Sequence, residues 1–447
     1  MSATVLELNA IQGLVLRGYR MPVGRYLYLR VEDARAARDW IGGIAQQVTT
    51  AAPWRSKPDS AVNIAFTAVG LRALGVPEAT VADFSAPFAQ GMVARAATLG
   101  DTGPSSPANW PGPLGSPDVH ILVLLAAGTA AALKDRQDRL ISALPPGLPV
   151  IARQDTEVLP GGTEHFGYVD GFSQPDIEGA EHGPRTGLGA PTGNGGWRPI
   201  RAGEFILGYP DEEGVLPDAP KPAELARNGS YLAVRKLHQD VAAFRRMVLA
   251  AAEFYPGGAD LLVAKLLGRW PDGTPLENSP KRAEPGLAAD PRRNNAFDYA
   301  DDPDGYRCPV GAHIRRVNPR LSLPFDGKLV NRHRLVRRGA PYGSPLPAGV
   351  LDDDGADRGN LFACFQADPA RQFEFIQSQW LNDGNAFRLG ADRDVIAGAQ
   401  TGDGKFTING EPPAFVGRIP RLVTTVGGEY FFAPGINGLN YLSRLTG

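Results

Sequence analysis

The first 160 residues alternate between apolar runs of strand length and segments whose apolar residues recur at helical spacing. In order, the expected elements are an extended apolar segment within 13–31, a helix that Asp33 can cap, strands at 61–69 and 119–125, a helix at 130–140 and an extended run at 150–159. With the short helices set aside, this β-α-β-β-α-β order is that of a ferredoxin-like domain, an α+β fold with an antiparallel sheet.

The second half of the chain repeats this outline, although no sequence repeat is visible. Its expected elements are a strand at 231–235, a helix capped by Asp240, a short helix at 259–267, a strand at 360–366, a helix that Asp368 and Pro369 open, and a last strand at 422–432. Gly and Pro are dense from 161 to 222, which predicts a long loop region with room for one short strand at 203–208. We therefore expect two ferredoxin-like domains, at 1–222 and 223–447.

Composition narrows the classes of partner. The chain has 447 residues, of which 43% are apolar, enough to form two hydrophobic cores. Its formal net charge is -2 and no basic stretch is interleaved with aromatic side chains, so nucleic acid is not an expected partner. The longest apolar run, 121–133, is too short to cross a bilayer and is interrupted by Gly128 and Thr129, so no membrane is expected either.

Two features bear on the compartment. The only cysteines are Cys308 and Cys364, too few in a chain of this length to form a disulfide framework, which favours a reducing environment. The first residues lack the basic segment and continuous apolar core of a secretory signal. We therefore expect a cytoplasmic protein.

The stretch 311–343 holds the most unusual combination of side chains, His313 and His333 among seven arginines. A haem would suit this combination, because its iron can take a histidine ligand and its propionates are carboxylates that guanidinium groups bind with two parallel hydrogen bonds. A solvated basic face is the plainer interpretation, and on this stretch alone it is favoured.

A second stretch, His165-Phe-Gly-Tyr-Val-Asp-Gly-Phe-Ser-Gln-Pro175, contains a G-x-x-D-G motif from Gly167 to Gly171. Together with His313-Ile-Arg-Arg316 and Leu335-Val-Arg-Arg-Gly-Ala-Pro-Tyr-Gly343, it resembles the dye-decolorizing peroxidase family. The resemblance extends over nearly the whole chain, from 11–13 to 372–375. An Asp-Gly turn alone would be a weak signal, but the three motifs in this order and at this spacing form a specific pattern.

The resemblance implies two ferredoxin-like domains, with one haem b per chain held in the C-terminal domain. It also implies a peroxidase that reduces hydrogen peroxide and oxidises small aromatic or dye substrates in one-electron steps. His313 would be the proximal metal ligand, and Asp394 would accept a hydrogen bond from its other ring nitrogen. Arg315 and Arg316 would contact the haem propionates.

On the opposite side of the haem, the resemblance places Asp170 as the acid and base that moves a proton between the two peroxide oxygens. Arg337 would supply a fixed positive charge beside it, although Arg334 and Arg338 are close enough in sequence to replace it. Burial would raise the pKa of Asp170 and a nearby arginine would lower it, and the sequence does not decide between them.

Two other functions compete with a peroxidase. A haem carrier or sensor without turnover would keep His313 but would not need the pair Asp170 and Arg337. A ferredoxin-like module that binds a different ligand would carry the same His and Arg residues on an ordinary surface.

Overall fold

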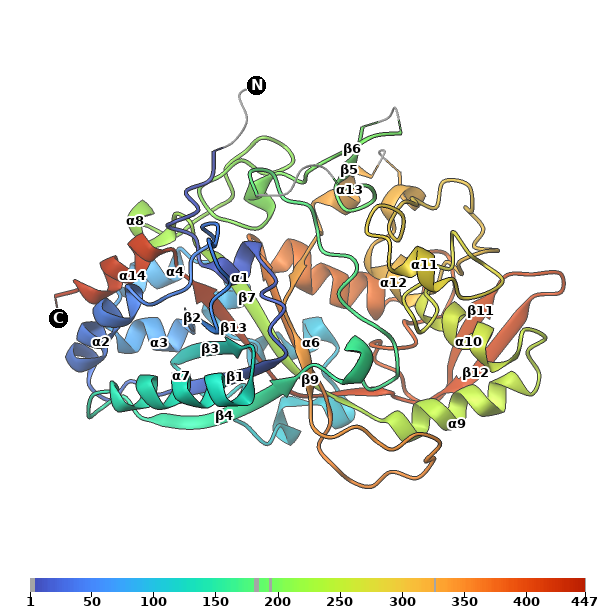
Figure 1. Ribbon diagram of the computed structural model, residues 1–447, viewed down its shortest axis with the longest axis horizontal. Coiled ribbons are helices and arrows are strands. Elements are labelled where there is room, and N and C mark those ends of the chain that lie inside the picture. The colour runs from blue at the N-terminus through green and yellow to red at the C-terminus, as the bar shows by residue number, and fades with distance from the viewer. Residues whose placement is uncertain (1–4, 181–184, 193–194, 325–326, 447) are drawn as a thin grey trace.

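The computed structural model describes residues 5–180, 185–192, 195–324 and 327–446, and its central feature is a nine-stranded antiparallel sheet (Figure 1). In sheet order the strands are β4 (Val150–Glu157), β1 (Val23–Leu29), β3 (Ile121–Ala127), β2 (Ser60–Phe66), β13 (Val423–Ala433), β7 (Ser230–Gln239), β10 (Gly359–Gln366) and β8 (Val336–Arg337), and β9 (Ala340–Tyr342) also pairs with β10. A unit of four strands, β4 to β2, and a unit of five, β13 to β8 with β9, therefore meet edge to edge, joined where Phe432 pairs with Phe66.

The N-terminal unit has the strand order of a ferredoxin-like fold, β4-β1-β3-β2. Its two main helices, α2 (Ala34–Ala45) and α7 (Ala130–Ser142), begin where Asp33 and Thr129 accept hydrogen bonds from the first free backbone N–H groups. Strand β3 is buried on both faces, which explains why it is an unbroken apolar run and does not alternate.

The C-terminal unit repeats this order as β13-β7-β10 with β8 and β9 at the far edge. Its helices α9 (Val241–Ala252) and α10 (Gly258–Leu267) confirm the predicted ones, and the Asp240 side chain caps α9. The expected fold class, two ferredoxin-like units with antiparallel sheets, is confirmed. We propose 1–222 and 223–447 as the two domains, because β1–β4 lie in the first range and β7–β13 in the second.

Two expected elements differ from the structure. Residues 203–208 do not form a strand, because the backbone turns tightly from Ala202 to Glu204 and Gly203 N–H donates to the Pro210 carbonyl at 3.0 Å. The short strands in this loop are β5 (Ala190–Pro191) and β6 (Trp197–Arg198). The helix after Pro369 is of the wide π type, formed by η7 (Ala370–Glu374) and η8 (Ile376–Leu381), a geometry that often accompanies functional sites.

The remaining α-helices are short. They are α1 (Gly13–Leu16), α3 (Ala68–Ala73), α4 (Glu78–Ala82), α5 (Ala86–Gln90), α6 (Ala96–Leu99), α8 (Ala223–Ala226), α11 (Pro285–Ala288), α12 (His313–Val317), α13 (Lys328–Asn331) and α14 (Ile436–Ser443). A separate hairpin, β11 (Gly404–Ile408) and β12 (Ala414–Ile419), projects at the end of the molecule opposite the C-terminus (Figure 1).

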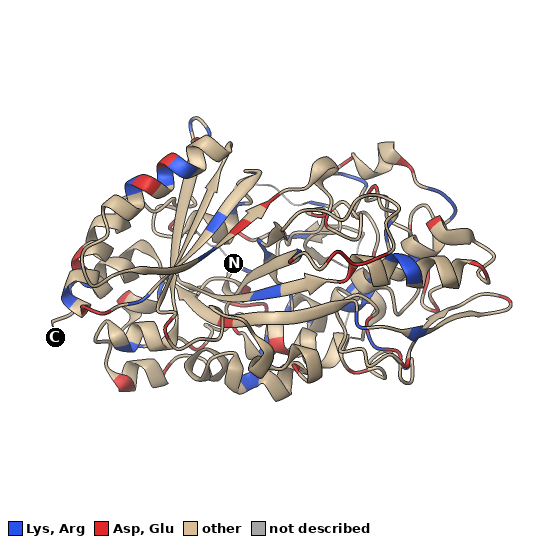
Figure 2. Ribbon diagram, turned by 90° about the horizontal axis from the view of Figure 1, so that it is seen from below, with Lys and Arg blue, Asp and Glu red and all other residues tan. Residues whose placement is uncertain are grey.

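The remaining features of the fold are the surface charges, the helix lengths and the cysteines. Acidic and basic residues are interspersed over both ends of the molecule (Figure 2). Within the described ranges, no helix has the length and apolar character needed to cross a membrane. Cys308 and Cys364 are both buried and free.

Candidate functional site

A cavity of about 290 Å³ lies on the sheet of the C-terminal unit, and all three sequence motifs reach it, the G-x-x-D-G motif from the loop region that follows β4. One wall is the face of the sheet formed by Arg235, Leu237 and Gln239 of β7 with Asn360 and Phe362 of β10. Asn360 pairs with Leu237 and Phe362 with Arg235, and side chains two residues apart share a face, so the register places these five together. The opposite wall is formed by the end of α10, by α12 and by the segment after Asp394.

The same face of β7 changes character along the strand. Tyr231 and Ala233 pack into the main apolar core, whereas Arg235, Leu237 and Gln239 line the cavity. The cavity therefore begins where a filled core ends, on one continuous sheet surface.

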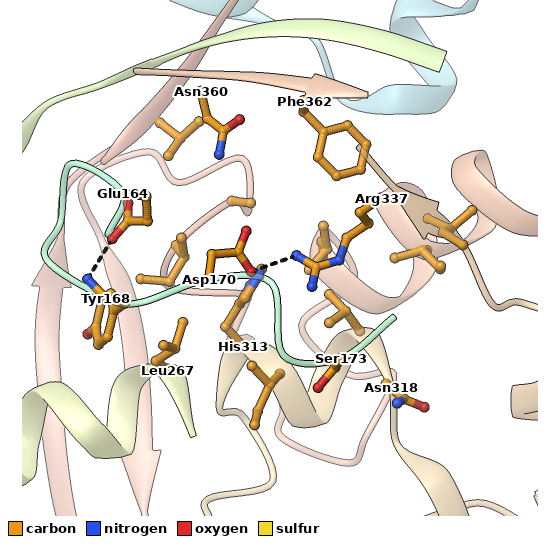
Figure 3. Close-up of a pocket in the computed structure, with 18 of the residues that line it drawn as sticks. Glu164, Tyr168, Asp170, Ser173, Leu267, His313, Asn318, Arg337, Asn360 and Phe362 are labelled. Atoms are coloured by element: carbon orange, nitrogen blue, oxygen red, sulfur yellow. Dashed lines mark hydrogen bonds and ion pairs between the residues drawn. The ribbon is translucent and has the colours of Figure 1, made fainter. Parts of the chain in front are cut away.

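His313, the first residue of α12, points into the cavity towards Asp170 (Figure 3). Its Nδ1 lies 3.0 Å from Oδ2 of Asp394, so the predicted partner is in hydrogen-bonding contact. Asp394 is fully buried, and its Oδ1 also accepts backbone N–H groups from Ile396 at 3.0 Å and Ala397 at 2.6 Å. Burial alone would raise the pKa of Asp394, but the His313 ring, Arg316 and the backbone donor outweigh it and lower that pKa.

An ionised carboxylate beside Nδ1 selects the tautomer of His313. Nδ1–H donates to Asp394, and the lone pair of Nε2 is left for a ligand on the cavity side. This is the arrangement that a histidine needs in order to bind a metal ion.

Asp170 and Arg337 lie across the cavity from α12 and are in contact with each other (Figure 3). Arg337 Nη1 is 3.3 Å from Asp170 Oδ1, and the two side chains are 36% and 52% exposed. The positive charge of Arg337 lowers the pKa of Asp170, and burial, which would raise that pKa, has a smaller effect. Of the two opposing effects that the sequence left open, the arginine is thus the larger, which favours the carboxylate form of Asp170 at neutral pH.

The glycines of the G-x-x-D-G motif have a backbone role. Gly167 and Gly171 have φ of +100° and +96°, a region that residues with a Cβ rarely adopt. Gly171 N–H also donates to Asp170 Oδ1 at 2.6 Å, which fixes the carboxylate.

The neighbouring arginines do not take the place of Arg337. Arg338 turns away from the cavity, and its Nε donates to the Leu14 carbonyl at 2.7 Å. Arg334 lines the cavity, but its Nη2 donates to the Leu188 carbonyl at 3.1 Å. Arg337 alone of the three is paired with Asp170 in the described part of the chain.

The structure does not support the prediction that Arg315 and Arg316 contact propionates. Both are fully buried and neither lines the cavity. Arg315 donates to the carbonyls of Asp302 and Cys308, each at 2.7 Å. Arg316 donates to the carbonyls of Trp380, Asp392 and Asp383 at 2.6, 2.6 and 2.8 Å. Residues two and three positions after His313 leave the helix in other directions than the His313 side chain does. The guanidinium groups of Arg315 and Arg316 therefore hold loops of the C-terminal unit together.

Sequence reasoning missed a different basic group, formed by Arg320 and Arg334 with Asn318, all of which line the cavity. Burial, followed by the Arg320 charge, lowers the pKa of Arg334 to about 9. The buried Oδ1 of Asn318 has no hydrogen-bond partner among the described residues. These residues lie in the same arginine-rich stretch, but only the folded chain shows which of its guanidiniums line the cavity.

The cavity suits a flat apolar cofactor with acidic groups and a central metal ion. Its walls include Leu267, Ile314, Val317, Leu335 and Ile376, and Arg320 and Arg334 supply positive charge for carboxylates. The described residues contain no group of three or more His, Cys, Asp or Glu side chains that could hold a bare metal ion. A single histidine ligand therefore fits a metal that the cofactor itself carries.

The chain also matches known proteins along most of its length. Residues 10–160 match the family model "DyP dimeric alpha+beta barrel domain", and residues 211–399 match "Dyp-type peroxidase, C-terminal". The chain is 31% identical to dye-decolorizing peroxidase msp1 of Mycetinis scorodonius, over 98% of this chain and 88% of that protein. It is 29% identical to multifunctional dye peroxidase DyP2 of an Amycolatopsis species, over 99% and 96% of the two chains.

Solved structures are similar over the full length. A dye-decolorizing peroxidase in complex with 2,6-dimethoxyphenol has a TM-score of 0.85 and 29% identity, covering 98% of this chain and 100% of that one. A fungal DyP-type peroxidase from Auricularia auricula-judae has a TM-score of 0.85 and 27% identity, covering 99% and 100%.

Proposed function

As a member of the dye-decolorizing peroxidase family, this protein is a haem peroxidase, and we propose that it binds haem b in the cavity of its C-terminal unit. One observation carries the proposal: a carboxylate-backed histidine faces a carboxylate and arginine pair across a single cavity. Arg320 and Arg334, in place of the predicted Arg315 and Arg316, would bind the propionates.

His313 would hold the metal through Nε2. Asp394 keeps the imidazole in the required tautomer and raises its basicity, which favours the more oxidised states of the metal. When bound, haem supplies the electron-transfer chemistry with peroxide, and the protein supplies the ligand, the pocket and the proton-carrying groups.

Asp170 and Arg337 would act on hydrogen peroxide as it is cleaved. Because its pKa is lowered, Asp170 is ionised and can take a proton from one peroxide oxygen and return it to the departing oxygen, which leaves as water. Arg337 would stabilise the negative charge that develops on that oxygen, and it does not itself titrate near neutral pH.

We propose small aromatic compounds and dyes as the electron donors, each oxidised by one electron. Two relatives support this proposal: msp1 is a dye-decolorizing peroxidase, and a solved dye-decolorizing peroxidase binds 2,6-dimethoxyphenol. We also propose a cytoplasmic location, supported by the two buried free cysteines.

The visible spectrum of the purified protein, before and after hydrogen peroxide is added, tests this proposal. We expect a Soret band that changes with peroxide and returns when a phenol is added. A haem carrier or sensor would give a Soret band that peroxide does not convert, and it would not need the contact between Asp170 and Arg337. A protein without a Soret band after reconstitution with haem would contradict the proposal.

A further inference from the structure

Asn360 has a polar side chain that lines the wall of the cavity, and the mechanism above gives it no role. It lies on β10 beside Phe362, on the same side of the cavity as Asp170 and Arg337 and opposite His313 (Figure 3). Its Oδ1 is buried and has no hydrogen-bond partner among the described residues.

An unpaired amide is costly at this position, because a buried acceptor without a donor destabilises a folded protein. The residue directly opposite on β7 is Leu237 and the next cavity residue along β10 is Phe362, so an apolar side chain would pack there without that cost. Asn360 is therefore explained by a partner that the protein itself does not provide.

The neighbouring strand repeats the feature. Gln239 lines the same wall, and its Nε2 donates to the carboxylate of Glu164 at 2.6 Å. The Oε1 of Gln239 is also buried and without a partner among the described residues. Two amide oxygens on one sheet face thus point to a ligand that carries O–H donors.

We propose that Asn360 binds hydrogen peroxide, its Oδ1 accepting a hydrogen bond from a peroxide O–H and so presenting the molecule to Asp170. This inference rests on the proposed function. Hydrogen peroxide has two O–H donors, and Asp170 and Asn360 offer one acceptor each on the same side of the cavity. Turning the amide would present Nδ2–H to ligands that only accept hydrogen bonds, such as cyanide.

The test compares the haem-loaded parent with Asn360→Leu, which keeps the size but removes both polar atoms, and Asn360→Asp, which keeps an acceptor. Cyanide affinity is measured by absorbance titration, and the reaction with peroxide by stopped flow. We expect Asn360→Leu to bind cyanide about five- to tenfold more weakly and to react with peroxide more slowly by a similar factor. At a pH well above the pKa of Asp170, Asn360→Asp should bind cyanide more weakly but keep the peroxide rate within about twofold, because its acceptor remains and the added negative charge leaves Asp170 ionised there.

Two results would overturn the inference. Unchanged cyanide affinity and peroxide rate in Asn360→Leu would make Asn360 a packing residue, and an Asp variant as slow as the Leu variant would remove the acceptor role. If Asn360→Leu does not fold, Asn360→Asp still tests the acceptor. A parent that neither binds haem nor reacts with peroxide would instead refute the proposed function, so the two failures are distinguishable.

Discussion

The two halves of this molecule build the same strand order but use it differently. In the N-terminal unit, Ile64 of β2 and Val123 of β3 lie in one filled apolar core with residues of α2. In the C-terminal unit, the corresponding face of β7 and β10 carries Arg235, Gln239 and Asn360 and borders a cavity.

The other face of the C-terminal sheet shows how this is possible. Leu232 and Val234 of β7 and Leu361 and Ala363 of β10 point away from the cavity and are fully buried in a second apolar core. Because side chains alternate along a strand, one face can be given to a ligand while the other anchors the strand. The ferredoxin-like unit thus becomes a ligand site through a change on one face of its sheet.

We call the C-terminal unit, which borders the cavity, the hollow unit, and the N-terminal unit, whose core is packed, the filled unit. The largest effect should come from His313→Ala, which removes the proposed metal ligand from the hollow unit and leaves the filled unit intact. We expect loss of most of the bound haem, or a Soret band that no longer resembles the parent's, with far-ultraviolet circular dichroism unchanged. His238→Ala is the matched control, because His238 lies on β7 but does not line the cavity. An unchanged Soret band and unchanged activity in His313→Ala would contradict the assignment.

Asp170→Asn should be next in size. It keeps the shape of the side chain but removes the base, and positioned acid and base groups contribute about 10²- to 10⁴-fold to rate. We expect the reaction with hydrogen peroxide to slow by a factor in this range while haem binding is kept. Stopped-flow measurement of the Soret change checks both, and a parent-like rate at every pH would exclude the role of Asp170.

Arg337→Leu should slow the same reaction by about 10²-fold, the effect of losing one preorganised charge or donor. It should also move the pH profile. In the proposed mechanism the reactive form of Asp170 is the carboxylate, so we expect the full rate above the pKa of Asp170 and a fall in rate as the pH drops through that pKa. Arg337 is the largest influence lowering that pKa. Without it the pKa rises, and the fall should begin at a higher pH than in the parent.

Arg337→Lys is the matched control for this shift, since it retains a positive charge but not the planar guanidinium. It should slow the reaction while leaving the acid limb of the profile closer to that of the parent. Identical acid limbs for parent and Arg337→Leu would show that Arg337 does not set the pKa of Asp170.

Sequence reasoning predicted most of the strands, because strands such as β3 and β10 are short apolar runs that can be recognised from residues adjacent in the sequence. It also predicted the contact between His313 and Asp394, but only through family resemblance, since 81 residues separate the two. It assigned Arg315 and Arg316 to the cavity, because the sequence of 311–343 does not show which of its seven arginines face the cavity. That depends on the carbonyl groups of other loops, to which Arg315 and Arg316 donate. Asn360 was missed for a related reason: a single polar residue in a strand has meaning only when the register shows which wall it joins.

The smallest effect should come from Ile64→Val in the filled unit, and it provides the sharpest contrast with the hollow one. Ile64 is fully buried between the sheet and the helices, and removing one methylene from such a site costs about 0.5–1.5 kcal/mol of unfolding free energy. Denaturant unfolding should detect this loss. The cavity is formed from other strands, so the Soret band, the cyanide affinity and the peroxide rate should equal those of the parent. A shift in any of the three would show that the packing of the N-terminal core is coupled to the site through the pairing of β2 with β13. The comparison of one filled and one hollow unit would then have to be replaced by a single cooperative sheet.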